Sequence, residues 1–180
     1  IVLGGHDADH IRVSDIFDLT DLDLIAVNTA STDSNIVFGD TGYIDYDDDQ
    51  LLGLGNATNP DDIDELKSTS THAIDLVHPD GSITVVEVGG SDTIDTGDGD
   101  DIVIGGRFGD LIRGRNGRNL VIGDSGRVLA AEIDDTMRFV DQPISIDLIT
   151  TIDPGDGGND RLLTGLDEDL VLGGMADDTI

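Results

Sequence analysis

The 180-residue chain contains no cysteine and no tryptophan, only nine basic side chains, and six aromatic residues. Without cysteine, the chain can form neither disulfides nor thiolate metal sites. The formal net charge of −30 disfavours nucleic-acid binding, because a nucleic acid presents a row of negative phosphates. No apolar run approaches the about 18 residues of a membrane-spanning helix, and no signal peptide is evident.

The acidic side chains are unusual in kind as well as in number. Of the 39 acidic residues only four are Glu, and the chain also holds 24 Gly. Asp favours turns and the ligation of hard cations, whereas Glu favours helices. Two interpretations are open, a disordered acidic chain or a folded chain whose charge is neutralised by bound metal. The hydrophobic content of 37%, mostly Ile, Leu and Val, favours the folded chain.

The chain contains an internal repeat of nine residues. Residues 96–126 divide into TGDGDDIVI, GGRFGDLIR, GRNGRNLVI and GDSG, which follow the pattern G-G-x-G-x-D-x-U-x, where U is a large aliphatic residue. The same frame recurs in residues 155–180, in the first twelve residues and near Asn35. Position six is Asp9, Asn35, Asp92, Asp101, Asp110, Asn119, Asp160, Asp169 or Asp178, and position eight is Val2, Ile11, Val37, Ile94, Val103, Ile112, Val121, Leu162, Val171 or Ile180.

These nonapeptides resemble the calcium-binding repeats of the repeats-in-toxin (hemolysin-type) family. The resemblance implies an all-β fold, a parallel β-roll or β-helix solenoid with loop, hairpin and short-helix excursions. It implies that residues one to six of each repeat form a turn and that residue eight points inward. It also implies several bound calcium ions, held by position-six side chains and backbone carbonyls of stacked turns. The candidate ligands are Asp9, Asp92, Asp101, Asp110, Asn119, Asp160, Asp169, Asp178, Gly97, Gly99, Gly105, Gly106, Gly173 and Gly174.

Physical chemistry supports this arrangement independently. Calcium takes six to eight oxygen ligands, and glycine allows a turn to aim its carbonyl groups inward through positive φ angles. The resemblance implies that turns two repeats apart stack, so position-six side chains should meet in pairs. The expected pairs are Asp92 with Asp110, Asp101 with Asn119, and Asp160 with Asp178.

A longer repeat is superimposed on the nonapeptides. Residues 89–106 realign with 157–174, and residues 35–44 realign with 119–128. A block of nonapeptides therefore ends in N-U-V-U-G-D-S/T-G, leaves into an excursion and returns at G-G-S/N-D. The expected domains are a first block with an insertion at 1–42, an excursion at 43–88, a second block at 89–126, an excursion at 127–154 and a third block at 155–180. Each excursion should carry a late strand, at 74–77 and at 146–149, and the two ends read as cuts through a longer tandem array.

An arginine-rich stretch departs from the acidic pattern. Five of the nine basic residues fall within 21 positions, and the turn 114–119 is basic where its neighbours are acidic. A guanidinium cannot share a calcium site, but it pairs well with carboxylates. Either this turn replaces calcium by charge pairing, or the stretch is a solvated surface patch. The five residues are Arg107, Arg113, Arg115, Arg118 and Arg127.

Two further patterns lie in the first excursion. Residues 59–62 read NPDD, which predicts the start of a short helix at about 60–67. Asp45, Asp47 and Asp49 alternate as at the start of an EF-hand loop. The glycine and the distal glutamate of that loop are missing, which favours a solvated acidic loop over a calcium site.

Arrangements typical of enzymes are not found. His6 and His10 are predicted to lie in a turn and in a strand, which favours surface residues over a transition-metal site. The sequence GDSG at 123–126 is similar to a serine-protease motif, but GDTG at 39–42 is its repeat counterpart. A carbohydrate-cleaving pair of carboxylates is disfavoured by the scarcity of aromatic residues that would line a sugar groove. The chain is therefore predicted not to be an enzyme.

The sequence accordingly predicts a calcium-dependent structural module, such as a stalk, an adhesin shaft or an extracellular fibre, of a secreted or cell-surface bacterial protein. Its expected partners are calcium ions and neighbouring repeats of the same chain, with neither nucleic acid nor a membrane span. One alternative is the calcium-binding tail of a secreted toxin or hydrolase whose catalytic domain lies outside this chain. Another is a self-polymerising subunit that forms a homopolymer, because open sheet edges can pair.

Overall fold

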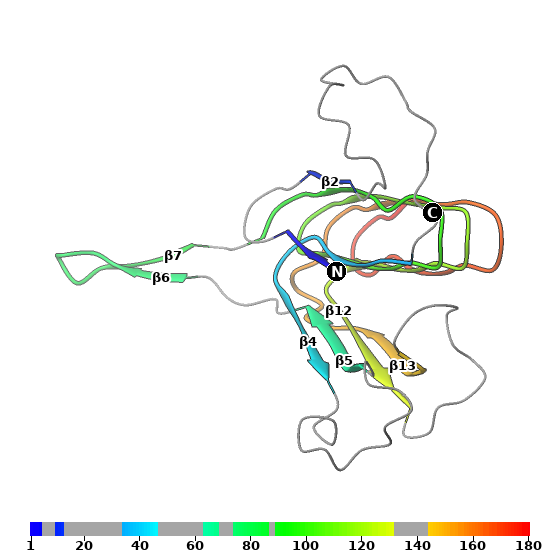
Figure 1. Cartoon of the computed structure of the whole chain (residues 1–180). Coiled ribbons are helices and arrows are strands. Elements are labelled where there is room, and N and C mark those ends of the chain that lie inside the picture. Colours follow the sequence, from blue (N-terminus) through cyan, green and yellow to red (C-terminus); the bar gives the residue numbers. More distant parts are fainter. Residues whose placement is uncertain (5–9, 13–33, 47–62, 69–73, 87–88, 132–143) are drawn as a thin grey trace, which may run out of the picture.

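The computed structural model of the chain describes residues 1–4, 10–12, 34–46, 63–68, 74–86, 89–131 and 144–180. Within these ranges the secondary structure consists of short β-strands, without a helix (Figure 1). The strands are β1 (Val2–Leu3), β2 (His10–Arg12), β3 (Ile36–Phe38), β4 (Gly42–Tyr46), β5 (Ile63–Ser68), β6 (Ile74–Val77), β7 (Ile83–Val86), β8 (Thr93–Asp95), β9 (Ile102–Gly106), β10 (Leu111–Arg115), β11 (Leu120–Asp124), β12 (Gly126–Ala130), β13 (Ile146–Thr151), β14 (Arg161–Thr164) and β15 (Leu170–Leu172).

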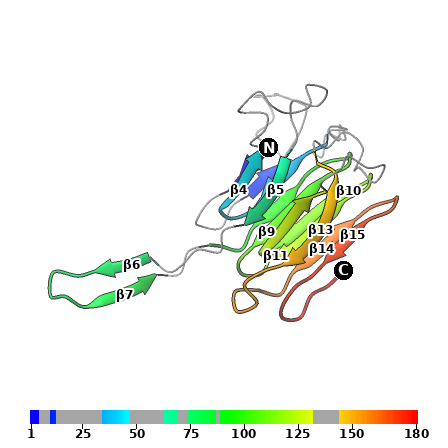
Figure 2. The same cartoon turned by 90° about the horizontal axis from the view of Figure 1, so that it is seen from below.

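The nonapeptides form two parallel sheets. Sheet A has the order β1-β3-β9-β11-β15 and sheet B the order β14-β10-β8-β2. Successive repeats alternate between the sheets, so β9 lies in sheet A, β10 in sheet B and β11 in sheet A again. Pairing follows the repeat without offset, because Val103 aligns with Val121 and Ile94 with Ile112. Figure 2 shows β9, β11 and β15 side by side.

Position-eight side chains fill the space between sheets A and B. They form one buried cluster, in which each fully buried aliphatic side chain contributes roughly 1.5–3 kcal/mol. The inward orientation expected for position eight is confirmed for this cluster, whereas Ile180 is 71% exposed. The members are Ile11, Val37, Ile94, Val103, Ile112, Val121 and Leu162, with Val2 and Val171 partly buried against them.

The central strands β3, β9 and β11 of sheet A are buried on both faces, whereas β10 of sheet B is buried on one. Every residue of β9 and β11 is buried, but burial alternates along β10. The sequences explain the difference, since Ile102-Val103-Ile104 is apolar throughout and Leu111-Ile112-Arg113 ends in a charge. A strand with two apolar faces needs cover on both sides.

The second cover comes from the two excursions together. Strands β4 and β5 of the first excursion and β12 and β13 of the second form sheet C, which is antiparallel and has the order β13-β12-β5-β4. The two hairpins join through β5 and β12, where Leu66 lies opposite Val128. Both residues pack on the outer face of sheet A, in a buried cluster with Phe38, Ile104 and Ile122. Figure 1 shows the four strands lying together on one side of the parallel strands.

Strands β6 and β7 pair with each other as sheet D, an antiparallel hairpin that extends away from the other sheets (Figures 1 and 2). Its turn is closed by Asp80, whose carboxylate accepts hydrogen bonds from the backbone N–H and the hydroxyl of Ser82 at 2.9 and 2.6 Å. The strand predicted at 74–77 is confirmed, and so is the one at 146–149. The two strands are not equivalent, because β6 belongs to sheet D and β13 to sheet C.

The expected fold class is wrong. The fold is not a parallel β-roll or β-helix solenoid with a short helix, but a mixed arrangement of two parallel and two antiparallel sheets, without a helix in the ranges described above. The helix predicted at 60–67 is replaced by β5 over Ile63–Ser68, and residues 59–62 lie outside the described ranges. Pairing of β5 with both β4 and β12 outweighs the local helix-start signal, because tertiary context overrides propensity.

Candidate functional site at the turns between the parallel sheets

The turns between sheets A and B stack in two rows. The A-to-B row holds the turns 105–110 and 173–178, together with the two turns that the excursions interrupt and that end at Asp92 and Asp160. The B-to-A row holds the turns 96–101, 114–119 and 165–169, with Asn35 at its start. Position six is therefore Asp throughout the described A-to-B row, but alternates between Asn and Asp in the B-to-A row.

Position-six side chains of the A-to-B row form a continuous ladder. The backbone N–H of Asp92 donates to Oδ1 of Asp110 at 2.7 Å, that of Asp110 donates to Asp160 at 2.8 Å, and that of Asp160 donates to Asp178 at 3.0 Å. The expected neighbours Asp92 and Asp110 are brought together, as are Asp160 and Asp178. The contact between Asp110 and Asp160 was not foreseen, because the second excursion separates them in sequence.

The B-to-A row has a ladder of the same kind. The backbone N–H of Asn35 donates to Oδ1 of Asp101 at 2.8 Å, that of Asp101 donates to Asn119 at 3.3 Å, and that of Asn119 donates to Asp169 at 3.0 Å. The expected neighbours Asp101 and Asn119 are therefore adjacent. Each ladder uses the Oδ1 atom of a position-six side chain as its acceptor. The second terminal atom, Oδ2 of aspartate or Nδ2 of asparagine, takes no part in these backbone hydrogen bonds.

The second carboxylate oxygen of the position-six aspartates, Oδ2, is the atom that a cation could contact. The Oδ2 atoms of Asp101, Asp110 and Asp160 are buried and accept no hydrogen bond within the described part of the chain. Burial raises the pKa of Asp101 to about 6, of Asp160 to about 7 and of Asp110 to about 9. Hydrogen bonds from Thr96 and Asn35 oppose this effect at Asp101, whereas neighbouring carboxylates add to it at Asp110 and Asp160. Keeping such a buried carboxylate ionised costs free energy of folding unless a positive charge lies close to it.

Glycines at the first position of the A-to-B turns lie against these oxygens. A Cβ atom at Gly105 would lie 2.3 Å from Oδ2 of Asp110, and one at Gly173 would lie 2.3 Å from Oδ2 of Asp178. Gly106 and Gly174, at position two, have φ angles of 124° and 119°. These four candidate residues therefore have structural reasons to be glycine that do not depend on a ligand.

The turn 96–101 matches the glycine pattern best. Gly97 and Gly99 have φ angles of 93° and 136°, in the region that favours glycine. Elsewhere the same backbone shape is adopted by other residues, with φ angles of 68° at Phe108, 92° at Asp167 and 80° at Ala176. The turn shape is thus kept where the glycine is lost.

Two aspartates outside position six close the necks of the excursions, and sequence reasoning gave them no role. Asp40 accepts the backbone N–H groups of Gly90 at 3.0 Å and of Arg107 at 2.7 Å. Asp124 likewise accepts those of Gly158 and Met175. Both are the Asp of the G-D-S/T-G motif, so the recurrence of that motif after 84 residues was the available signal.

Several arginines of the basic stretch form ion pairs. Arg115 contacts both carboxylate oxygens of Asp95, each at 2.7 Å, and Arg107 contacts Asp156 at 3.2 Å. Arg127 pairs with Glu65 of sheet C. These three arginines thus pair with carboxylates that lie outside position six. That charge pairing replaces calcium in the turn 114–119 stays a prediction.

The remaining candidates are placed as follows. Asp169 is half-buried in the B-to-A row, Asp45 is exposed in β4, and His10 begins β2. Asp9 and the other members of the His6 and Asp45 patterns lie outside the described residues. Across the ranges that the structure covers, no three His, Cys, Asp or Glu side chains converge on one point. A cation at these turns would therefore need backbone carbonyls among its ligands.

Comparison with known proteins yields no relative. No protein-family model matches the chain, and no curated protein or solved structure is similar to it. The described ranges contain no helix of sufficient length and apolar character to cross a membrane.

Proposed function

We propose that the chain is a calcium-dependent structural module of a secreted or cell-surface bacterial repeat protein, akin to the repeats-in-toxin proteins that its nonapeptides resemble, and that it is not itself an enzyme. The observation that carries the proposal is the set of buried Oδ2 atoms of Asp101, Asp110 and Asp160, which accept no hydrogen bond in the described part of the chain. Leaving such a charged group unpaired costs on the order of several kcal/mol.

The residues at these turns fit a hard cation by their chemistry. Carboxylate and carbonyl oxygens are the ligands that calcium takes in proteins, and each turn supplies both kinds. Asp110 and Asp160 would contribute carboxylates in the A-to-B row, and Asp101 in the B-to-A row. A bound calcium ion supplies the positive charge that these buried oxygens lack.

The same neutralisation would couple folding to calcium. At a formal net charge of −30, the chain repels itself in the compact state. Stacking of the turns brings position-six carboxylates near one another, and the charges of Asp92 and Asp160 add to the effect of burial in raising the pKa of Asp110. The folded sheets are therefore more stable where these charges are balanced, which suits extracellular modules with calcium affinities of about 10⁻⁴–10⁻³ M. The module would serve as a stalk, shaft or fibre segment.

A calcium titration followed by far-ultraviolet circular dichroism tests the proposal. In chelator the β-sheet signal should be lost at a markedly lower temperature than in calcium, and added calcium should raise the melting temperature cooperatively. Magnesium is the matched control, because it keeps its own waters and demands octahedral geometry. A melting temperature in chelator that added calcium leaves unchanged would overturn the proposal.

A further inference from the structure

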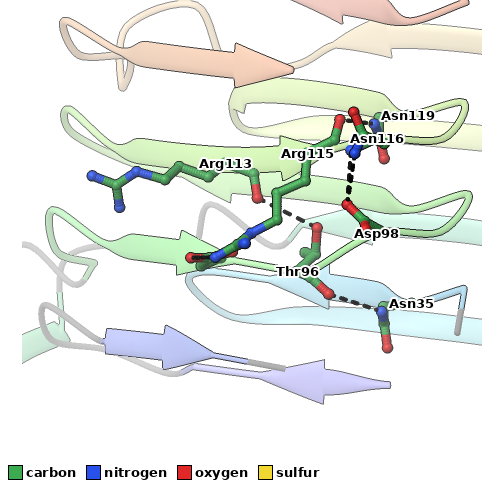
Figure 3. A network of polar contacts seen from close by, with 8 residues as sticks. Asn35, Thr96, Asp98, Arg113, Arg115, Asn116 and Asn119 are labelled. Carbon is green, nitrogen blue, oxygen red and sulfur yellow. Dashed lines mark hydrogen bonds and ion pairs between the residues drawn. The ribbon is translucent and has the colours of Figure 1, made fainter. Parts of the chain in front are cut away.

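The turn 114–119 is closed by a side-chain amide. Asn119 is fully buried at position six, and its Nδ2 atom donates to three oxygens. These are the carbonyl oxygen of Arg115 at 3.2 Å (Figure 3), the carbonyl oxygen of Gly117 at 3.1 Å, and Oδ1 of Asp169 in the next turn at 3.1 Å. Three oxygens thus converge on a single group that carries partial positive charge.

The hydrogen bonds fix the orientation of this carboxamide. Its Oδ1 atom accepts the backbone N–H of Asp101 at 3.3 Å. Rotating the amide by half a turn would place its oxygen against three other oxygens and its NH2 group against an N–H donor. Only the orientation with Nδ2 toward the carbonyls places a donor against an acceptor in all four contacts, with the two N–H groups of Nδ2 shared among three oxygens.

Aspartates at the same position lack this solution. The group of Asp110 and Asp160 that corresponds to Nδ2 of Asn119 is Oδ2, which is buried and has no donor in the described part of the chain. Asn35 behaves as Asn119 does, since its Nδ2 donates to the carbonyl of Thr96 at 3.3 Å and to Oδ1 of Asp101 at 3.0 Å. Position six therefore exists in two forms, one that supplies its own donor and one that needs an external positive charge.

We propose that the carboxamide of Asn119 takes the place of a cation in turn 114–119, so that this turn closes without calcium and Asn119 is not a calcium ligand. The inference rests on the proposed function, because it assumes that the turns with Asp at position six bind calcium. Arg115 does not fill this role. Figure 3 shows its side chain running away from Asn119, and its guanidinium contacts Asp95 instead.

Replacing the amide by a carboxylate tests the inference directly. In Asn119→Asp, an oxygen would face the carbonyls of Arg115 and Gly117 and the carboxylate of Asp169. In chelator, the variant should unfold roughly 5–10 °C below the parent chain. In saturating calcium this deficit should disappear, and calorimetric titration should count one more bound calcium ion than in the parent.

Asn159→Asp is the matched control, because it adds the same charge to an exposed amide whose Oδ1, the acceptor of the backbone N–H of Asp177 at 3.0 Å, is retained in aspartate. Its calcium-dependent shift in melting temperature should equal that of the parent chain. The inference is overturned if Asn119→Asp is as stable as the parent in chelator, or if calcium leaves its deficit in place.

The reciprocal variant is Asp101→Asn, which keeps the inference testable should Asn119→Asp fail to fold. It should melt at a higher temperature than the parent in chelator and bind one calcium ion fewer. An unchanged melting temperature in chelator contradicts the inference. If the parent shows no calcium dependence while Asn119→Asp acquires it, the proposed function fails and the role of Asn119 stands. If the parent depends on calcium but calcium does not rescue Asn119→Asp, the proposed function stands and the role of Asn119 fails.

Discussion

Removal of calcium should make the stability of this protein fall as pH rises. Burial holds the folded-state pKa of Asp101, Asp160 and Asp110 at about 6, about 7 and about 9, against an ordinary value of 3.8. The folded protein therefore keeps these protons more tightly than the unfolded chain does. Their contribution to stability is fully present below the unfolded pKa, and it is lost as pH rises through each folded pKa.

The size of the loss follows from the two most shifted groups. Between pH 5 and pH 8 it amounts to roughly 3 kcal/mol for Asp160 and roughly 4 kcal/mol for Asp110, at about 1.4 kcal/mol for each pH unit below the folded pKa. Domains of ordinary size have free energies of unfolding of only about 5–15 kcal/mol. The calcium-free protein should thus be markedly weaker at pH 8 than at pH 5.

Urea unfolding in chelator at several pH values, followed by circular dichroism, measures this slope. Asp110→Asn removes the titrating group and should flatten the slope, whereas Asp147→Asn, at an exposed position of β13, removes the same charge and should leave it unchanged. Saturating calcium should abolish most of the loss in the parent chain. A calcium-free free energy of unfolding that is constant or rises from pH 5 to pH 8 would refute the reasoning.

Three further predictions concern the scaffold, and urea unfolding measures each. Ile112→Ala should cost about 2–5 kcal/mol, because the side chain is fully buried between sheets A and B; a loss below that range would contradict the packing. Gly105→Ala should cost about 1–3 kcal/mol, since its Cβ would lie 2.3 Å from the carboxylate of Asp110, whereas Gly155→Ala, with open space around it, should be neutral. Asp124→Asn should cost about 1–3 kcal/mol, because one of its two acceptor oxygens becomes a donor that faces a backbone N–H; equal stability would exclude its role at the neck.

Much of the candidate site could be read from the nonapeptide frame. The position of a residue in the frame indicates whether its side chain lies in a turn or in a strand. Together with the stacking that the family resemblance implies, the frame predicted the burial of Val103 and Ile112 and the adjacency of Asp101 and Asn119. The frame did not reveal that Asp110 meets Asp160, because 50 positions and a complete excursion separate them. Nor did it distinguish Asn from Asp at position six, since that difference lies in which atoms face the carbonyls.

The fold was predictable in its parallel part and not elsewhere. The helix-start signal at 59–62 led to an incorrect prediction of a helix. Pairing of β5 with β4 and β12 stabilises the strand by more than the local sequence stabilises a helix. The apolar strands Ile102-Val103-Ile104 and Leu120-Val121-Ile122 did carry a clue that sheet A needs cover on both faces. They could not identify the cover, which comes from two hairpins distant in sequence.

The sequence by itself determined the nine-residue frame, the inward row of aliphatic side chains, the acidic turns and the demand for positive charge that follows from them. These are local or strictly periodic properties, and periodicity converts spacing into geometry. Only the tertiary structure decided that the excursions share sheet C, that Asp40 and Asp124 close their necks, and that Asn119 supplies the donor that its aspartate counterparts lack. Those outcomes depend on which non-periodic segments meet and on how a buried side chain turns, and no spacing in the chain encodes either.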